Sequence, residues 1–458
     1  MSTAVVLAAG LGTRMRSPLA KVLHPLLGRP MVGWIVAALR EAGVAEIIVV
    51  VHHQEEAVRA ALLAQDPAVR FVRQEAPKGT GDALRCALPL LRPQGLVLVT
   101  AGDTPMLQAQ DIRRLLEAHA EKTGRMATAA SFETDNPQGY GRMVRGVGIV
   151  EQPECTPLQA AISEVNSGLY AFEAAWLHAK VPALQPHAPK GEYYVTDLVG
   201  TLDGVETGVA GGFPASAFAG VNDRAQLAEA RGILRRRVSR AWAEQGVDFA
   251  DLDHALVDVT AVLHAGASIG YGAVIEGRSE IAGNVGPYAV LRHTIVAAGA
   301  TIHAASVCDG ATVEAGAQVG PMGRLRPGAV IEEGAHVGNF VEVKNSRIRR
   351  GAKANHLAYI GDADVGEAAN IGAGTITCNY DGYKKHRSII GARAFIGSNT
   401  AMVAPITIGE GAIVGAGSTL TQDVPADAIA IARGSQKNHE GSASRLRARI
   451  AGDPPKGP

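Results

Sequence analysis

The sequence predicts two domains of different fold class: a doubly wound α/β (Rossmann-like) domain followed by a parallel β-helix of hexapeptide repeats. In the first half, short apolar runs rich in β-branched residues alternate with segments of helical spacing. In the second half, aliphatic residues recur every six positions. All three tryptophans lie in the first half, and the sequence then becomes rich in Gly, Ala, Val and Ile. This shift of composition marks the domain boundary.

Size and composition indicate an ordered globular protein. The chain has 458 residues, 47% of them hydrophobic, and its 44 basic residues balance 44 acidic ones. This balance gives no sign of a nucleic-acid partner. The N-terminal apolar run is too short for a signal peptide, and no stretch approaches the ~18 consecutive apolar residues of a membrane span. Four scattered cysteines favour reduced thiols. We therefore expect a cytoplasmic protein without membrane insertion.

The first half contains clear strand and helix signals. Residues 46–51 and 95–103 predict buried parallel strands, whereas residues 31–43 and 111–124 predict helices that end near a glycine. Ligands of doubly wound sheets bind at the carboxyl ends of the strands. The segments "LAAGLGTRM" (7–15) and "TAGDTP" both lie at such ends. A Gly-rich turn after a strand favours phosphate binding there.

One long helix is expected over residues 225–245, between the two halves. Leu227, Leu234, Val238 and Trp242 lie near one face, and five arginines spread over the rest. No aromatic residues interleave these arginines, so a solvated linker helix is favoured over a nucleic-acid surface. The expected domains are 1–224, the linker helix 225–247, the repeat domain 248–435 and a C-terminal tail 436–458, whose composition favours partial disorder.

Three phased runs of aliphatic residues define the repeat domain. Three hexapeptides make one triangular coil, so residues 254–434 give about ten coils and a rod of roughly 48 Å. Thirteen residues separate Thr377 from Ile390, which predicts a loop inserted into the solenoid. The runs are Val257, Leu263, Ile269, Ile275 and Ile281; Val307, Val313, Val319, Leu325, Ile331, Val337 and Val343; and Ile390, Ile396, Met402, Ile408, Val414 and Leu420.

The motifs in their order resemble a known bacterial family. "LAAGLGTRM…KVLH", "GTGDA" and "AGD" in the first half are similar to sugar-phosphate nucleotidyltransferases. With "GPMGRLRPGA", "NHLAYIGD" and "NIGAGTITCNYDG" in the second half, nearly the whole chain resembles the bifunctional N-acetylglucosamine-1-phosphate uridylyltransferase/glucosamine-1-phosphate N-acetyltransferases. The resemblance implies a left-handed solenoid, a homotrimer, and production of UDP-N-acetylglucosamine for peptidoglycan and lipopolysaccharide. The implied substrates are glucosamine-1-phosphate, acetyl-CoA, N-acetylglucosamine-1-phosphate and UTP.

For uridylyl transfer, the resemblance implies a site that positions a triphosphate and neutralises its charge. The glycine loop would approach the nucleotide, basic residues would hold the triphosphate, and Mg²⁺ would be bound by Asp103 and Asn222. The implied nucleotide- and sugar-binding residues are Leu7, Ala8, Ala9, Gly10, Arg14, Lys21, Gln74, Gly79, Thr80, Gly141, Glu151, Asn166 and Asn222. Three positions depart from the common family pattern: Ala20, Asp82 and Ala101.

For acetyl transfer, the resemblance implies that His356 is the general base. Histidine suits this task because it can take a proton from an amine near pH 7. The implied sugar-phosphate residues are Arg326, Lys344, Tyr359 and Asn370. The implied acetyl-CoA residues are Ala373, Asn379, Tyr380, Ser398, Ala416 and Arg433.

Two other interpretations remain open at this stage. The chain could be a single-activity nucleotidyltransferase whose solenoid only oligomerises it. It could also be a non-catalytic scaffold built from the same two domain types. The histidine motif and inserted loop weigh against the first, and the retained Arg14, Lys21, Asp103 and Asn222 weigh against the second.

Overall fold

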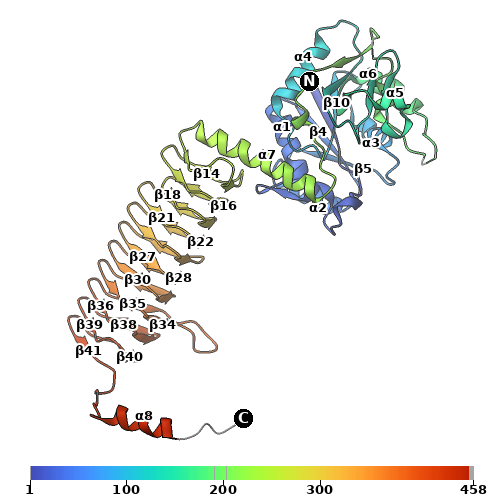
Figure 1. Cartoon of the computed structure of the whole chain (residues 1–458). Coiled ribbons are helices and arrows are strands. Elements are labelled where there is room, and N and C mark those ends of the chain that lie inside the picture. The colour runs from blue at the N-terminus through green and yellow to red at the C-terminus, as the bar shows by residue number, and fades with distance from the viewer. Residues whose placement is uncertain (1, 190, 203, 453–458) are drawn as a thin grey trace. The chain divides into compact units, whose positions relative to one another are not determined.

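The computed structural model describes residues 2–189, 191–202 and 204–452, and its elements are drawn in Figure 1. The chain divides into two compact units. Unit 1 comprises Met1–Glu244 with Asp251–Thr260, and unit 2 comprises Gln245–Ala250 with Ala261–Pro458. No helix in the described part of the chain is long and apolar enough to cross a membrane.

Unit 1 is built around a mostly parallel sheet in the order β11-β7-β10-β6-β1-β4-β5, with β8 and β9 attached to β10. Its strands are β1 (Ser2–Leu7), β2 (Pro25–Leu26), β3 (Arg29–Pro30), β4 (Glu46–Val51), β5 (Arg70–Arg73), β6 (Leu96–Ala101), β7 (Ala127–Glu133), β8 (Arg142–Val144), β9 (Gly148–Val150), β10 (Glu164–Glu173), β11 (Thr207–Ala210) and β13 (Leu256–Val257). Its helices are α1 (Met31–Glu41), α2 (Glu55–Leu63), α3 (Thr80–Ala87), α4 (Ala109–Ala120), α5 (Pro157–Ala160), α6 (Ala174–Lys180) and α7 (Arg224–Ala243).

Helices cover both faces of this sheet, as its sequence pattern predicts. Val6 of β1 packs in one core with α1 and α4, whereas its neighbour Val5 packs in a second core with α3 and α6. Alternate residues of a strand thus serve both layers, which is why these strands are apolar throughout. Strand β10 runs antiparallel between β6 and β7. The sequence pattern did not reveal this direction.

Helix α7 packs along one face against the rest of unit 1. Asp223 caps its start by accepting a hydrogen bond from the backbone N–H of Gln226 at 2.9 Å. Leu227 and Leu234 are buried in a cluster that also contains Met15 and Met31. The apolar face that the sequence predicts for this helix is therefore buried against other segments of unit 1.

Unit 2 is a left-handed parallel β-helix, the fold that the six-residue period and the resemblance predict (Figure 1). Its first sheet contains β12 (Asp248–Phe249), β15 (Ser268–Ile269), β18 (Asn284–Val285), β21 (Thr301–Ile302), β24 (Gln318–Val319), β27 (His336–Asn339), β30 (Lys353–His356), β33 (Asn370–Ile371), β36 (Phe395–Ile396), β39 (Ile413–Val414) and β41 (Ile429–Ala430). Its second contains β16 (Val274–Glu276), β19 (Val290–Arg292), β22 (Val307–Asp309), β25 (Arg324–Leu325), β28 (Glu342–Lys344), β31 (Tyr359–Gly361), β34 (Ile376–Cys378), β37 (Ala401–Val403) and β40 (Thr419–Leu420). Its third contains β14 (Val262–Leu263), β17 (Glu280–Ile281), β20 (Ile295–Val296), β23 (Thr312–Val313), β26 (Val330–Ile331), β29 (Arg347–Ile348), β32 (Ala363–Val365), β35 (Ser388–Ile390) and β38 (Ile406–Ile408).

The repeat residues fill the solenoid interior with one exception. Val313, Ile360 and Ile396, like the other inward aliphatic side chains, are at most a few per cent exposed. Val307 was expected to point inward, but it is half-buried and Cys308 takes the interior position. The six-residue phase of this run therefore begins one repeat later, at Val313.

The loop between β34 and β35 interrupts the solenoid where the sequence predicts an insertion (Figure 1). At the end of the chain, α8 (Ser442–Gly452) contains no buried residue. The rest of the expected tail, 453–458, lies outside the described residues.

Candidate active sites

The Gly-rich loop after β1 lines a cavity of about 340 Å³ at the carboxyl end of the unit 1 sheet. The cavity walls come from β1, from the segment after β5 and from the start of α3. Of the predicted residues, Leu7, Ala8, Ala9, Gly10, Lys21, Gln74, Gly79, Thr80 and Asp103 border this cavity.

A second cavity of about 700 Å³ shares Ala101 and Asp103 with the first. Its other walls come from the segments around β8, β9 and β10 and from the start of α7. The structure therefore brings all the predicted uridylyl-site residues to two adjoining cavities. Those bordering the second are Arg14, Asp103, Gly141, Glu151, Asn166 and Asn222.

The ammonium of Lys21 links the two expected metal ligands. It contacts a carboxylate oxygen of Asp103 and donates a hydrogen bond to Asn222 Oδ1 at 3.1 Å. The Lys21 and Asp103 side chains are only 12% and 23% exposed, so water screens this ion pair weakly. Both oxygens thus contact the same ammonium nitrogen, so they lie close enough together to bind a common cation.

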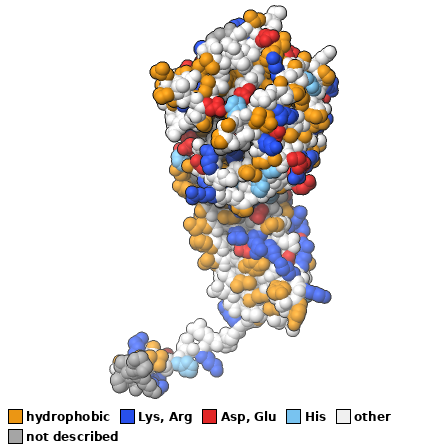
Figure 2. Space-filling model, turned by 90° about the vertical axis from the view of Figure 1, so that its right-hand side faces the viewer, with side chains coloured by type: hydrophobic (Ala, Val, Ile, Leu, Met, Phe, Trp, Pro, Cys, Tyr) orange, Lys and Arg blue, Asp and Glu red, His pale blue; other side chains and the backbone are white. Residues whose placement is uncertain are grey.

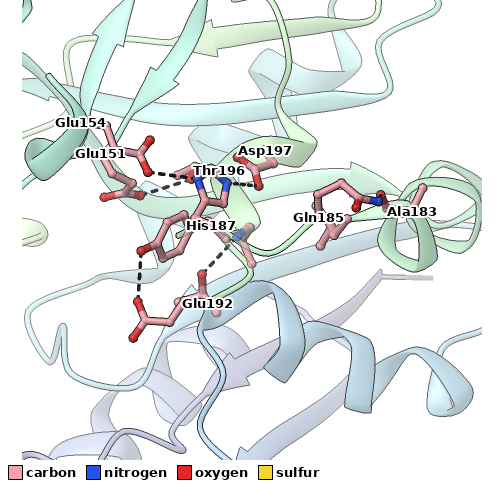
Figure 3. A network of polar contacts seen from close by, with 12 residues as sticks. Glu151, Glu154, Ala183, Gln185, His187, Glu192, Thr196 and Asp197 are labelled. Atoms are coloured by element: carbon pink, nitrogen blue, oxygen red, sulfur yellow. Dashed lines mark hydrogen bonds and ion pairs between the residues drawn. The ribbon is translucent and has the colours of Figure 1, made fainter. Parts of the chain in front are cut away.

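Glu151 lies at the edge of a polar network around His187 (Figure 3). Thr196 donates to Glu151 Oε1 at 3.2 Å. His187 Nδ1 and Nε2 lie 2.9 Å from carboxylate oxygens of Glu154 and Asp197, respectively. Carboxylates only accept, so both ring nitrogens donate and the ring is an imidazolium. The hydrogen bond to Asp197, followed by that to Glu154, raises the pKa of His187 above its ordinary value.

The network has two consequences for the larger cavity. His187 ties Glu154, on the segment that contains Glu151, to Asp197, whose neighbour Thr196 donates to Glu151. Burial raises the pKa of the Glu151 carboxyl, with the hydrogen bond from Thr196 opposing this shift. His187 therefore holds the wall on which Glu151 sits.

Several residues of these cavities escaped sequence reasoning. Tyr140, Phe218 and Gln226 line the larger cavity, and Glu192 and Tyr194 line the smaller. Tyr140 adjoins the predicted Gly141, so its "GYGR" context could have indicated it. Tyr194 donates to Glu192 Oε2 at 3.0 Å. Glu192 and Tyr194 lie on a loop with no strong motif, which gave no signal.

In unit 2, His356 ends β30 and is exposed. Its register partner on β27 is Asn339, and the two side chains are joined by a 2.8 Å contact between Nδ1 and Oδ1. With the amide oxygen accepting, Nδ1 carries a hydrogen, and in the neutral form of such a ring Nε2 has the lone pair. The pair can therefore present a base to solvent. Asn339 escaped sequence reasoning because only the coil register reveals it.

A cluster of cations adjoins this histidine along the second solenoid sheet. Lys344 ends β28, and Tyr359 opens the neighbouring β31. Close approach of the Lys385 ammonium lowers the pKa of Lys344, and the charge of Arg326 acts in the same direction. Arg326 donates to Glu342 at 2.9 Å, and this hydrogen bond raises its pKa. Cations held together in this way favour a bound anion.

The inserted loop carries further members of this cluster. Asn379 is buried and donates to Asp362 Oδ2 at 2.5 Å, whereas Tyr380 is 60% exposed. Lys385 and Asp362 line a cavity of about 330 Å³ beside the loop. Sequence reasoning missed Lys385, although it lies within the "YKKH" of that loop. Figure 2 shows Lys and Arg side chains gathered on one face of the solenoid.

Four of the six expected acetyl-CoA residues, Ala373, Ser398, Ala416 and Arg433, follow one corner of the solenoid, coil after coil. Asn399 N–H donates to the Ala373 carbonyl, and Gly417 N–H donates to that of Ser398. The guanidinium of Arg433 then donates to the Ala416 carbonyl at 2.6 Å. Ala373 follows β33, the strand that contains Asn370 and pairs with β30, so this corner continues from His356.

Comparison with known proteins identifies both units. Residues 4–184 match the MobA-like NTP transferase domain, and residues 388–422 match the hexapeptide repeat of succinyl-transferase. The chain thus combines a nucleotidyltransferase domain with a hexapeptide-repeat domain.

Full-length relatives define the family. The chain is 42% identical to the bifunctional protein GlmU of Sorangium cellulosum over 98% of this chain and 97% of the relative. It is 42% identical to that of Trichlorobacter lovleyi over 96% and 98%, and 44% identical to that of Burkholderia vietnamiensis over 93% and 95%. This chain belongs to the family of bifunctional GlmU proteins.

Proposed function

We propose that the chain makes UDP-N-acetylglucosamine in two transfers. Unit 2 acetylates glucosamine-1-phosphate with acetyl-CoA, and unit 1 transfers UMP from UTP to N-acetylglucosamine-1-phosphate with release of pyrophosphate. Membership of a bifunctional family supports both activities. The observation that carries the assignment within unit 1 is the meeting of the two cavities at Asp103. We further propose that the protein acts in the cytoplasm.

In unit 1, the smaller cavity would hold the nucleotide and the larger one the sugar phosphate. A phosphate oxygen of the sugar attacks the α-phosphorus of UTP, and the bond to the bridging oxygen of the leaving pyrophosphate breaks. Arg14 and Lys21 would neutralise the triphosphate. Gly141, Glu151 and Asn166 would orient the sugar, so the chain acts mainly by positioning.

Asp103 and Asn222 fit a magnesium ion. They contribute one carboxylate and one amide oxygen toward a common position, and Mg²⁺ commonly combines few protein oxygens with water and substrate phosphates. When bound, the ion would neutralise phosphate charge.

In unit 2, Nε2 of His356 would take a proton from the amine of glucosamine-1-phosphate. The amine nitrogen would form the bond to the thioester carbonyl carbon as the carbon–sulfur bond breaks, and the proton taken up by His356 would pass to the leaving sulfur of coenzyme A. Asn339 would hold the ring in the required tautomer. Arg326 and Lys344 would bind the phosphate, with Tyr359 and Asn370 beside the sugar.

We propose a homotrimer, the state that the family resemblance implies, and the exposure of the acetyl-CoA residues supports a neighbouring chain beside them. Tyr380 is largely exposed and the corner formed by Ala373, Ser398 and Ala416 lies at the solenoid surface. A groove deep enough for a cofactor-sized substrate would require a neighbouring solenoid as its second wall. Sedimentation velocity should give three chains per particle. A monomer with full acetyl transfer would contradict the proposal.

One reaction tests the overall function. Purified protein, Mg²⁺, UTP, acetyl-CoA and glucosamine-1-phosphate should yield UDP-N-acetylglucosamine, and omission of acetyl-CoA should prevent this unless N-acetylglucosamine-1-phosphate is supplied. Product only from the acetylated sugar would leave a uridylyltransferase with a structural solenoid. No product from either sugar would favour the scaffold interpretation.

A further inference from the structure

The buried amide of Gln74 has its orientation fixed by its neighbours. Gln74 follows β5 and is 2% exposed. Its backbone N–H donates to the Val51 carbonyl at 2.9 Å, and its own carbonyl contacts His52 Nδ1 at 2.8 Å. The side chain borders the smaller cavity, beside Gly79 and Thr80. Its position is therefore set before any ligand arrives.

Both amide hydrogens of Gln74 are used within the protein. Nε2 donates to Asp82 Oδ2 at 2.8 Å and to the Gly79 carbonyl at 3.2 Å. Both partners can only accept, so a rotation of the amide by half a turn would set oxygen against oxygen. Within the described chain, Oε1 of Gln74 has no hydrogen-bond partner. The cavity wall thus presents an acceptor to a ligand.

Asp82 is the partner that enforces this orientation. It is the third residue of α3, where the positive end of the helix dipole favours a negative charge. Arg85 Nη1 lies 3.9 Å from Asp82 Oδ1, and the Arg85 guanidinium is itself held 4.3 Å from the ring centre of Tyr193. The Asp82 carboxylate is therefore held in place beside Gln74.

We propose that Asp82 is a positioning residue that selects the nucleobase by locking Gln74. The inference rests on the proposed uridylyl-transfer function of unit 1. Uracil carries a hydrogen on N3 and can donate to Gln74 Oε1, whereas cytosine has a lone pair at N3 and would oppose it. Leaving a buried polar group unpaired weakens binding strongly, which makes such a site selective. Thymine has the same N3–H, so Asp82 does not distinguish it from uracil.

The test compares nucleotides in the full-length protein and in the variant Asp82→Asn. Asparagine has the same shape, but its amide can donate, so Gln74 becomes free to turn. We measure kcat/KM for UTP, CTP and 5-methyluridine triphosphate with N-acetylglucosamine-1-phosphate and Mg²⁺. The UTP-to-CTP ratio should fall by about tenfold or more in the variant. The ratio of UTP to its 5-methyl analogue should stay unchanged.

Glu75→Gln provides a matched control. Its carboxylate is adjacent in sequence and 83% exposed, and its contact is with Arg73 rather than Gln74. This variant removes the same charge and should leave the UTP-to-CTP ratio as it is. Thermal unfolding checks that Asp82→Asn is folded.

The outcomes separate this inference from the function on which it rests. Failure of the wild-type protein to use UTP would overturn the proposed function. An active wild type with an unchanged UTP-to-CTP ratio in Asp82→Asn would overturn the role of Asp82 alone. An equal fall of kcat/KM for UTP and CTP would also overturn it, because a merely structural role would lower kcat/KM for both nucleotides by the same factor.

Discussion

The two candidate sites are assembled in different ways. In unit 1, residues far apart in sequence, such as Lys21, Asp103 and Asn222, meet because several strands end at one edge of a sheet. In unit 2, the candidate residues follow the coil register, so that His356 lies beside Asn339. The first arrangement encloses cavities within a single chain, whereas the second leaves a line of residues on a surface.

The sharpest test of this separation is Asp103→Asn. Loss of the carboxylate should reduce uridylyl transfer by about a thousandfold, since charge stabilisation in the transition state would fail. Acetyl transfer should remain unchanged. Release of pyrophosphate and of free coenzyme A thiol measures the two reactions.

Glu121→Gln is a suitable control because Glu121 is an exposed carboxylate of the same unit, at the end of α4. It should retain both activities. Loss of both activities in folded Asp103→Asn protein would contradict the existence of two independent sites.

The reciprocal test is His356→Ala in unit 2. Acetyl transfer should fall by about a hundredfold or more, since a general base contributes this much. Asn339→Ala should give a smaller loss, because the ring would keep its base but lose its orientation. Uridylyl transfer from supplied N-acetylglucosamine-1-phosphate should not change, and thermal unfolding checks that unit 2 is folded. A small effect of His356→Ala on acetyl transfer would assign the histidine a structural role.

The contrast extends to how the units tolerate added volume. A Cβ at Gly338 would lie 1.9 Å from the Asn355 carbonyl oxygen of the next coil, where backbone cannot yield easily. Gly338→Ala should destabilise unit 2 by about 1–3 kcal/mol and weaken acetyl transfer. Thermal unfolding followed by calorimetry measures this change.

Gly434→Ala is the matched control, because no atom lies within 4 Å of a Cβ added there. The unfolding temperature of Gly434→Ala should equal that of the wild type within experimental error. Equal unfolding temperatures for Gly338→Ala and wild type would show that the coils separate more readily than their packing indicates.

The smallest expected effect concerns the pH dependence of unit 1. The folded-state pKa of His187 is raised above 6.5, so its two ion pairs are complete below that value and are lost as the pH rises through the folded-state pKa. The KM for N-acetylglucosamine-1-phosphate should therefore rise a few-fold with pH, while the KM for UTP changes little.

The variant His187→Gln cannot carry the charge and should remove this pH dependence of KM. At low pH its KM should exceed that of the wild type, and above the folded-state pKa of His187 the two should converge. An identical pH profile in both proteins would exclude His187 as the support of the Glu151 wall.

Sequence patterns predicted most of the architecture because burial leaves periodic traces. Strand β4 spans residues 46–51 as expected, and α1 begins at Met31 as expected. The antiparallel direction of β10 could not be predicted, because apolar content reports burial and not direction. The sequence pattern assigned the interior position to Val307, but Cys308 occupies it. The pattern could not separate the two, because a small buried thiol is as compatible with the interior as an aliphatic side chain.

The candidate sites were predictable where motifs exist and hidden where only geometry brings residues together. Asp103 and His356 stand in recognisable motifs. The pairings of Gln74 with Asp82 and of His356 with Asn339 depend on side-chain contacts across elements. The support of Glu151 through His187 involves three separate segments, none with a characteristic spacing.

The stacking register of unit 2 also has a kinetic consequence. In unit 1, Ser2 pairs with Leu96, whereas a solenoid residue such as Ile295 pairs with Thr312, about one coil away. Contacts between residues close in sequence favour rapid folding, so each coil of unit 2 should form on the coil before it. The step that pairs Asn370 with Phe395 must close the inserted loop as well. Loop closure makes it the costliest step of growth, and the loop would therefore divide the solenoid into two folding segments.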